Sequence, residues 1–422
     1  MKKFLKSIVA SLLALMARAI IRKYDPVIVM ITGSVGKTST KDAVASALSG
    51  RFYARASEKS YNSEFGVPLT IIGAKNPWEN PSAWLKVFQE ALALILLPSR
   101  YPKLLILEVG ADSPGDLQKI LSIATPNAVI VTKLPDIPVH VEAYAGPAAV
   151  REEEFLPALA LAAGSPLIIS ADDKYARIMA SRLVANVITV GFAEDADLRI
   201  EKPHFKHGAM EGTLVEKGTK RVLRATGALG RPQLYAPAMA FALAKALHME
   251  PEEIMRNLEE YLPPPGRSRI LNGLHDSILV DDSYNASPAA VEEALAGLEL
   301  LPATRRIVAL GDMLELGRYS VEEHARIGEL VASSADMIVT VGSRSEVALE
   351  AARRHGMNSE QAFGFTSSAE AAAALLEVVQ KGDVVLVKGS QSMRMEKIVE
   401  ALLADKKDAR LLVRQDLEWK RR

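Results

Sequence analysis

Residues 27–40 read VIVMITGSVGKTST, an apolar run that leads through two glycines to a lysine. Residues 41–48 then carry apolar side chains at helical spacing, so we predict a strand, a loop and a helix. In such a loop the glycines let the backbone fold closely around a polyphosphate, and the N–H groups at the helix start point at the anion. The residues predicted to bind a nucleoside triphosphate are Gly33, Ser34, Val35, Gly36, Lys37, Thr38 and Ser39.

Lys37 and Thr38 give this loop its chemistry. Lys37 is placed to neutralise phosphate charge, and the hydroxyl of Thr38 can ligate Mg²⁺. The longer phosphate-loop pattern has glycine where this chain has Ile31, so only the shorter form G-x-x-G-K-T is present. The alternative is an ordinary glycine turn with a chance lysine, which the strand, loop and helix order makes the weaker interpretation.

The composition indicates a globular protein of more than one domain. A chain of 422 residues is too long for one ordinary core, so we expect two or three domains. Lysine plus arginine and aspartate plus glutamate both total 51, so no overall field favours nucleic acid, and function must lie in local sites. The chain has no cysteine, which excludes disulfides and thiolate chemistry.

Residues 1–25 form an apolar segment flanked by basic residues. Its uncharged part, residues 7–17, is too short to span about 30 Å of hydrocarbon as a helix. A cleaved signal peptide is disfavoured because the nucleotide-binding strand follows almost at once. Two interpretations remain, a basic helix lying on the membrane surface and a helix packed on the next domain.

Residues 26–262 alternate between strand and helix patterns, and we assign them to a central ATP-binding domain. Residues 60–68 are predicted to be a polar loop, and residues 193–226 a small antiparallel insertion. The other predicted strands are 52–56, 103–111, 127–132, 166–170 and 187–190, and the other predicted helices are 84–97, 173–184, 234–247 and 251–261.

Glu108 ends the predicted strand 103–111. A carboxylate at the end of a buried strand beside a phosphate loop can hold Mg²⁺. Alone, such a glutamate is more often a solvated strand end, but the phosphate loop favours the metal role.

Residues 263–266 read PPPG and form the clearest linker in the chain. Alternating strands and helices after it predict a C-terminal domain, residues 263–422, with a doubly wound, Rossmann-like α/β fold. The central domain is predicted to have a mostly parallel sheet, so the fold class is α/β throughout. Residues 281–288 are expected to be a loop, and residues 410–413 a last short strand.

Several motifs in this order resemble those of the Mur ligases, ATP-dependent enzymes of peptidoglycan precursor synthesis. The motifs are TGSVGKT at 32–38, residues 62–68, EVGA at 108–111, HVE at 140–142, PGR at 265–267, DDSYNASP at 281–288, GDMLELG at 311–317, KGS at 388–390 and MRME at 393–396. DDSYNA, LGDMLELG and KGS with MRME are together specific for the branch that adds D-alanyl-D-alanine to a muramoyl tripeptide.

The resemblance implies that ATP phosphorylates a substrate carboxylate and that an amine then attacks the acyl phosphate. It implies that Lys37, Thr38 and Glu108 hold ATP and a first Mg²⁺, and that His140 helps to bind a second Mg²⁺. Arg267 would reach the ATP phosphates. Asp282 would contact the ribose and Asn285 the nucleotide, although both residues also favour a capped turn before the helix at 289.

The chain departs from the family pattern at three places. The family has a carbamylated lysine downstream of the histidine, but this chain has no lysine between Lys133 and Lys174. We hypothesise that Glu154, or Glu153 after a one-residue slip, supplies a permanent carboxylate for the second metal; the alternative is a solvated acidic first helical turn. Residues 227–238 replace a His/Asn pair that helps to hold adenine in the family. We also expect no counterpart of the family's N-terminal UDP-binding domain, since only the apolar segment precedes the phosphate loop.

These observations give one leading function and two alternatives. We expect a ligase that uses ATP and Mg²⁺ and joins D-Ala-D-Ala to a muramoyl-peptide acceptor, which is free or lipid-linked. The alternatives are a related ligase with another carboxylate acceptor, of the folylpolyglutamate or poly-amino-acid type, and a nucleotide-binding paralogue without ligase activity. We expect a cytoplasmic monomer without a nucleic-acid partner, which contacts the inner face of the membrane through residues 1–25.

Overall fold

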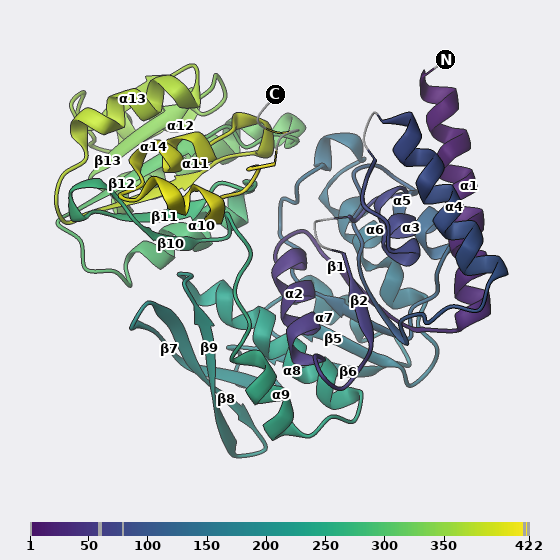
Figure 1. Ribbon diagram of the computed structural model, residues 1–422. Coiled ribbons are helices and arrows are strands. Elements are labelled where there is room, and N and C mark those ends of the chain that lie inside the picture. Colours follow the sequence, from purple (N-terminus) through teal and green to yellow (C-terminus); the bar gives the residue numbers. More distant parts are fainter. Residues whose placement is uncertain (1, 58–60, 78–79, 417–418, 420–422) are drawn as a thin grey trace.

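Two β-sheets organise the computed structural model, which describes residues 2–57, 61–77, 80–416 and 419 (Figure 1). The strands of the first sheet are β1 (Val27–Thr32), β2 (Ala54–Ala56), β3 (Leu104–Glu108), β4 (Ala128–Val131), β5 (Pro166–Ser170), β6 (Asn186–Gly191), β7 (Leu198–Lys206), β8 (Ala209–Glu216) and β9 (Thr219–Thr226). Their order is β2-β3-β1-β4-β5-β6-β7-β8-β9. Pairing is parallel from β2 to β7 and antiparallel from β7 to β9. The predicted antiparallel segment therefore extends the edge of the main sheet.

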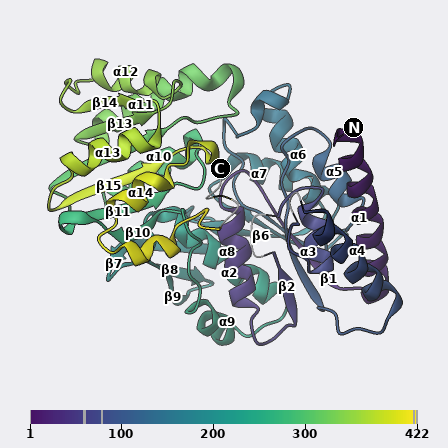
Figure 2. The same ribbon diagram turned by 45° about the horizontal axis from the view of Figure 1, so that its top comes forward.

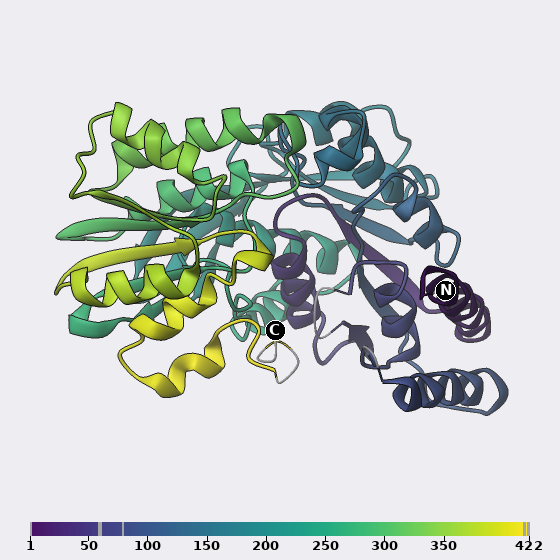
Figure 3. The same cartoon turned by 90° about the horizontal axis from the view of Figure 1, so that it is seen from above.

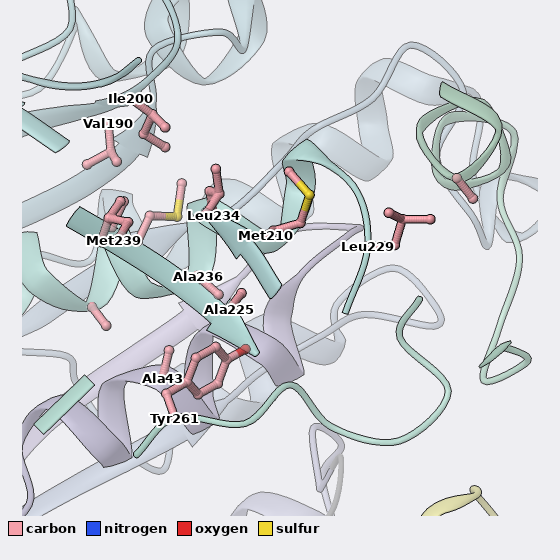
Figure 4. Close-up of a cluster of buried hydrophobic side chains, with 14 of the residues drawn as sticks. Ala43, Val190, Ile200, Met210, Ala225, Leu229, Leu234, Ala236, Met239 and Tyr261 are labelled. Atoms are coloured by element: carbon pink, nitrogen blue, oxygen red, sulfur yellow. The ribbon is translucent and has the colours of Figure 1, made fainter. Parts of the chain in front are cut away.

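Helices cover both faces of this sheet. They are α1 (Lys2–Tyr24), α2 (Lys37–Ala47), α3 (Gly66–Ile72), α4 (Pro81–Leu96), α5 (Asp116–Leu121), α6 (Pro147–Leu159), α7 (Lys174–Ala180), α8 (Tyr235–Ala246) and α9 (Pro251–Leu258). On one face α2, α8 and α9 bury a core against the sheet, part of which is drawn in Figure 4, where Met239 of α8 lies with Val190 and Ile200 of the strands. On the other face the core contains side chains of α1, α3, α5, α6 and α7.

The second sheet forms the core of the C-terminal domain. Its strands are β10 (Arg269–Asn272), β11 (Ile278–Asp282), β12 (Arg305–Gly311), β13 (Met337–Val341), β14 (Ala362–Phe365) and β15 (Asp383–Lys388), in the order β10-β11-β15-β12-β13-β14. All pairs are parallel except β10 with β11. The helices are α10 (Pro288–Leu298), α11 (Ser320–Ser334), α12 (Glu346–Arg354), α13 (Ser368–Val378) and α14 (Glu396–Leu402). The predicted α/β fold class, with two mostly parallel sheets, is confirmed.

Some local predictions were wrong. Residues 410–413 form no strand, because the chain from Lys406 to Leu411 is a 3₁₀ helix. The predicted loop at 281 begins two residues later, since Asp281 and Asp282 pair with β15 inside β11. Strands β10 and β14 were missed, and α3 begins at Gly66, inside the predicted polar loop. Ser60 of that loop and the last residues of the tail lie outside the described residues.

Helix α1 packs on the central domain, which agrees with the second of the two interpretations of residues 1–25. Its buried side is formed by Leu13, Ala17 and Ile20, all of which are completely buried. It contacts α3 and α4 and lies at the edge of the molecule far from the C-terminal domain (Figure 2). Among the residues that the structure describes, none of the helices combines the length and apolar character needed to cross a membrane.

Candidate active site

The loop between β1 and α2 has a backbone that glycine makes possible. Gly33 has φ +115° and Gly36 has φ +92°, which lie in the left-handed region that other residues rarely adopt. A Cβ atom on Gly33 would lie 2.5 Å from Oγ1 of Thr132. Gly36 directly precedes α2, and the ammonium group of Lys37 donates to the carbonyl of Gly33. The loop therefore closes tightly over the start of the helix, which is the geometry that binds phosphate.

Glu108 lies beside this loop because β1 and β3 are parallel neighbours, with Ile31 opposite Glu108. Oγ1 of Thr38 donates to Oε1 of Glu108 over 3.1 Å. The other oxygen, Oε2, is buried and has no hydrogen-bond partner in the described part of the chain. Burial raises the pKa of Glu108, although the positive charges of Lys41 and Lys37 oppose the shift. A buried carboxylate with a vacant acceptor beside a threonine hydroxyl fits a hard divalent cation.

Glu154 projects from the middle of α6 toward the same loop. It is 3% exposed, and Oγ of Ser34 donates to its Oε2 over 2.6 Å. Its carbonyl oxygen accepts a hydrogen bond from Oγ1 of Thr32, also 2.6 Å long. Burial raises the pKa of Glu154, while the charge of Lys37 and the bond from Ser34 lower it. The alternative of a solvated first helical turn is wrong, since α6 begins at Pro147 and Glu154 is buried.

Glu153, its neighbour, has a different position. Its Oε1 accepts hydrogen bonds from the backbone N–H groups of Gly115, 3.1 Å, and Leu117, 3.0 Å, at the start of α5. This contact satisfies donors at a helix N-terminus, which is a capping role. Of the two glutamates that the sequence left open, Glu154 is the one that contacts the loop.

His140 lies between the two domains. Its Nδ1 is 2.9 Å from Oε2 of Glu315, which comes from the C-terminal domain, and its Nε2 is 3.5 Å from Oδ1 of Asp112. Burial by itself lowers the pKa of His140, but the hydrogen bond and charge of Glu315, with Asp112, raise it overall. His140 has φ +63° and Glu315 has φ +65°. Two non-glycine residues in this strained region that touch each other are typical of a functional site.

Arg267 and Asp282 border the site from the C-terminal side. The guanidinium of Arg267 lies 4.2 Å from the ring centre of Tyr284, and its charge acts on Glu108. Both carboxylate oxygens of Asp282 have partners, because Oδ1 accepts from the N–H of Ser268 over 3.1 Å and Oδ2 from Nζ of Lys388 over 2.6 Å. Asp282 therefore holds the C-terminal part of the site together in this structure.

Asn285 is not brought into the cavity that Asp282 lines. Its Oδ1 accepts from the N–H of Ala286 over 2.9 Å, and its carbonyl accepts from Nζ of Lys388 over 3.0 Å. Ser287 caps α10 by accepting from the N–H of Ala290. These contacts agree with the capped turn, the alternative that the sequence analysis gave for this residue.

A cavity of about 390 Å³ extends from the loop between the domains. Val35, Gly36 and Ser39 line it at the loop, and Arg267, Asp282 and Lys388 at the C-terminal domain. At its other end, Phe192 and Tyr235 meet edge to face with ring centres 5.3 Å apart, and Arg231 stacks 4.1 Å from the ring centre of Phe192. An aromatic, partly polar end fits a nucleobase.

A role for these residues was not predicted from the sequence. Gln233 and Tyr235 lie in the segment 227–238 that was identified as departing from the family pattern, and both line the cavity. Nε2 of Gln233 donates to the carbonyl of Arg267 over 3.3 Å, and the hydroxyl of Tyr235 donates to Asp172 over 2.5 Å. Phe192 directly follows β6, and the carboxyl end of a parallel strand is a signal that could have identified it.

The predicted metal ligands Thr38, Glu108, His140 and Glu154 do not form one compact group. Within the described ranges, no three histidine or acidic side chains gather closely enough to hold a metal ion by themselves. Mg²⁺ commonly keeps several waters and uses one or two carboxylates together with substrate phosphates. The Thr38 and Glu108 pair fits that kind of site.

The two domains are in contact across the loop. Nζ of Lys133 lies 3.0 Å from Oε1 of Glu293, and the N–H of Glu142 donates to the carbonyl of Glu315 over 3.5 Å. Together with the His140 pair, these contacts hold the C-terminal domain against the central domain beside the phosphate loop. A closed arrangement of this kind limits the access of water to the space between them.

Comparisons with known proteins agree with this architecture. UDP-N-acetylmuramoyl-tripeptide--D-alanyl-D-alanine ligase of Mycobacterium tuberculosis (strain CDC 1551 / Oshkosh) is 28% identical over 410 residues, which cover 90% of this chain and 73% of the relative. The ligase of the same name from Bacillus subtilis (strain 168) is 22% identical over 397 residues, covering 92% and 78%.

Solved structures share the fold. The MurF ligase from Thermotoga maritima in complex with ADP has a TM-score of 0.78 at 22% identity and covers 95% of this chain and 84% of that one. Folylpolyglutamate synthase of Mycobacterium tuberculosis, complexed with ADP, has a TM-score of 0.64 at 15% identity, covering 93% and 94%.

Family models match both domains. The model described as Mur ligase middle domain matches residues 31–244, and the one described as Mur ligase, glutamate ligase domain, matches residues 266–391. Together they cover more than half of the sequence. The chain therefore belongs to the Mur ligase family.

Proposed function

We propose that this protein is an ATP-dependent ligase that joins the amine of D-Ala-D-Ala to the carboxylate of a muramoyl tripeptide in peptidoglycan precursor synthesis. The observation that carries the proposal is the Thr38 and Glu108 pair, with its vacant carboxylate oxygen, beside a glycine loop that opens into an interdomain cavity. The names of the curated relatives support the choice of substrates. The protein acts in the cytoplasm as a monomer.

The reaction has two bond-making steps. The acceptor carboxylate attacks the γ-phosphorus of ATP, and the bond to the β–γ bridging oxygen breaks, which gives an acyl phosphate and ADP. The amine of the second substrate then attacks the acyl carbon, and phosphate leaves as the amide forms and a proton is released. Both steps concentrate negative charge, so positioned positive groups accelerate them. Lys37 and Arg267 supply this charge from the two domains.

Mg²⁺ would supply further charge neutralisation when it is bound. Thr38 and Glu108 would hold the first ion, and His140 and Glu154 would support the second. The burial of Glu154 against Ser34 supports this role, because a permanently ionisable carboxylate stands beside the loop without any carbamylation. The charges of Lys37 and His140 both act on Glu154, which is consistent with one connected site.

The test is ADP release by the full chain with a panel of substrates. The panel contains free and lipid-linked muramoyl tripeptides, folate with glutamate, and D-Ala-D-Ala as the amine, and mass spectrometry identifies the amide. We expect ADP release and a new amide only with a muramoyl tripeptide plus D-Ala-D-Ala. Lys37→Ala should abolish both, whereas Lys381→Ala, which changes a highly exposed lysine, should leave both unchanged.

Other results of the panel would contradict the proposal. An amide formed only with folate and glutamate would assign the chain to the folylpolyglutamate-type alternative. ADP binding without any stimulated ADP release would favour a nucleotide-binding paralogue that ligates nothing. The loop, the carboxylate pair and the interdomain cavity all suit phosphoryl transfer, which argues against the nucleotide-binding paralogue. A folylpolyglutamate-type ligase would use the same phosphoryl transfer, so the choice of the muramoyl acceptor rests on the names of the curated relatives.

A further inference from the structure

Two helices far from the active site expose an unusual number of large apolar side chains. The α1–α4 face, as we call this surface, consists of Ile8, Leu12, Leu15, Leu85, Leu92, Leu96 and Leu97. Each of these side chains is between 40% and 68% exposed. They make up seven of the sixteen exposed large hydrophobic residues in the described part of the chain, although α1 and α4 are two of many helices. Such a concentration marks an interaction surface.

We infer that the seven residues share one surface, because the two helices that carry them contact each other and run side by side in the same direction (Figures 1 and 2). At their C-terminal ends, Nζ of Lys23 donates to the carbonyls of Leu94 and Leu97 over 2.8 and 2.6 Å. The hydroxyl of Tyr24 also donates to the carbonyl of Leu94, over 2.8 Å. These bonds attach the end of α1 to the end of α4 and keep the two apolar rows next to each other.

The exposed leucines are not needed for packing. Each helix already buries another apolar row against the domain, with Leu13 and Ala17 in α1 and Val87 and Ala91 in α4. The exposed residues of α1, which are Ile8, Leu12 and Leu15, are separated by four and three positions, and this spacing places them on one side of the helix. Both helices are thus apolar on two sides, and folding accounts for one side only.

Basic residues predominate around this face. Helix α1 contains no acidic residue, and the described side chains Lys6, Arg18, Arg22 and Lys23 are basic. Helix α4 adds Lys86 and a single acid, Glu90. The whole chain is neutral, so the positive charge is a local feature. Arg18 and Arg22 also line a hollow of about 500 Å³ at the edge of α1. An apolar surface with a basic border is complementary to an anionic lipid surface.

We propose that the α1–α4 face docks onto the surface of an anionic phospholipid bilayer, with the leucines at the acyl boundary and the basic residues against the head groups. The helices lie in the plane of the bilayer and do not cross it. The C-terminal domain lies on the side of the molecule opposite α1, and α2, which follows the phosphate loop, lies between them, so docking leaves the interdomain cavity accessible (Figures 2 and 3). The contact goes beyond the ligase reaction and does not depend on it.

Vesicle flotation tests the proposal with the full chain. Vesicles of phosphatidylcholine alone are compared with vesicles of phosphatidylcholine plus phosphatidylglycerol, at low and high salt. We expect binding to the anionic vesicles that weakens as salt is added. The double variant Leu15→Glu with Leu92→Glu should lower the partition coefficient by at least about tenfold, because it removes apolar area and adds negative charge.

Matched controls separate the face from general effects. Leu376→Glu, on α13 of the C-terminal domain, changes a leucine that is 41% exposed and should bind vesicles like the wild type. Arg18→Gln with Arg22→Gln should weaken binding to the anionic vesicles. Each variant must have the melting temperature and the ADP affinity of the wild type. These two measurements show that the variant is folded, whatever its binding to vesicles.

The proposal is overturned if the wild type does not float with anionic vesicles, or if the Leu15 and Leu92 double variant floats as well as the wild type. It is also overturned if the wild type ignores vesicles but sediments as a dimer that the double variant disrupts. In that case the α1–α4 face is an interface between two copies of the chain. A monomer that ignores vesicles would leave the face to a protein partner and would equally reject the lipid surface.

Discussion

Replacing Glu154 by glutamine removes one buried negative charge beside the phosphate loop and changes little else. The glutamine Oε1 atom can still accept the hydrogen bond that Oγ of Ser34 gives to the carboxylate over 2.6 Å. The side chain is 3% exposed, so its environment allows no rearrangement toward solvent. Any effect of Glu154→Gln therefore reports on the charge.

The charge has opposite effects on Mg²⁺ binding and on the stability of the metal-free protein. If Glu154 supports the second Mg²⁺, its loss should raise the Mg²⁺ concentration for half-maximal ADP release by about 10- to 100-fold, or about 1.4–2.7 kcal/mol. In the metal-free protein, burial raises the pKa of Glu154. The contribution of Glu154 to stability is therefore full at low pH, and it is lost as the pH rises through the raised pKa that this carboxyl has in the folded protein. Without Mg²⁺ near pH 8, the variant should melt at a higher temperature than the wild type.

ADP release titrated with MgCl₂ measures the first effect, and thermal melts with and without Mg²⁺ measure the second. Glu153→Gln is the matched control, because Glu153 caps α5 and does not contact the loop. The glutamine keeps the acceptor oxygen and loses only the negative charge at the start of α5, so it should lower the free energy of unfolding by at most about 1 kcal/mol and leave the Mg²⁺ dependence unchanged. Glu154 does not support the second Mg²⁺ if Glu154→Gln has the Mg²⁺ dependence of the wild type, or if Glu153→Gln is the variant that shifts this dependence.

Four further variants test the loop, α1 and a buried acid. Leu13→Ala should lower the free energy of unfolding in denaturant titrations by about 2–5 kcal/mol, because Leu13 is fully buried. Leu15→Ala, on the exposed side of α1, should change it by less than about 0.5 kcal/mol; equal losses would mean that α1 is not part of the core. Gly33→Ala should abolish ADP binding measured by calorimetry, because the added Cβ atom would lie 2.5 Å from Oγ1 of Thr132. An unchanged affinity for ADP would mean that this loop does not hold the phosphates. Burial raises the pKa of Asp281 to about 6. The contribution of this side chain to the stability of the fold is therefore full below about pH 3.8 and is lost as the pH rises through about 6. The free energy of unfolding of Asp281→Asn should therefore exceed that of the wild type by an amount that grows with pH over this range, up to at most about 3 kcal/mol. A difference that does not change with pH would contradict this.

Much of the fold was predictable because its signals are local. Two glycines after a run of β-branched residues, and a helical spacing of apolar side chains, identified the loop and most strands of both domains. The strands β10 and β14 were missed because each is only four residues long and carries little periodicity. Residues 410–413 looked like a strand, but the chain from Lys406 to Leu411 is a 3₁₀ helix, and residues 410–413 join neither sheet in the described structure.

The candidate site was predictable only in part. The register of two parallel strands places Glu108 next to the loop, and this follows from strand order rather than from any local pattern. Asn285 looked like a nucleotide contact, yet its side chain is engaged by its own turn. Phe192 and Tyr235 escaped prediction because they are far apart in sequence and meet only when β6 and α8 come together.

The sequence by itself determined the phosphate loop, the two alternating α/β domains and the presence of acidic residues near position 154. Only the tertiary structure decided which acid faces the loop. Adjacent residues on a helix point about 100° apart, so the packing of α6 against β1 and β4 turns Glu154 inward and leaves Glu153 to cap α5. It likewise decided which apolar side of α1 is buried, because a helix with two apolar sides carries no local signal for the one that meets the core.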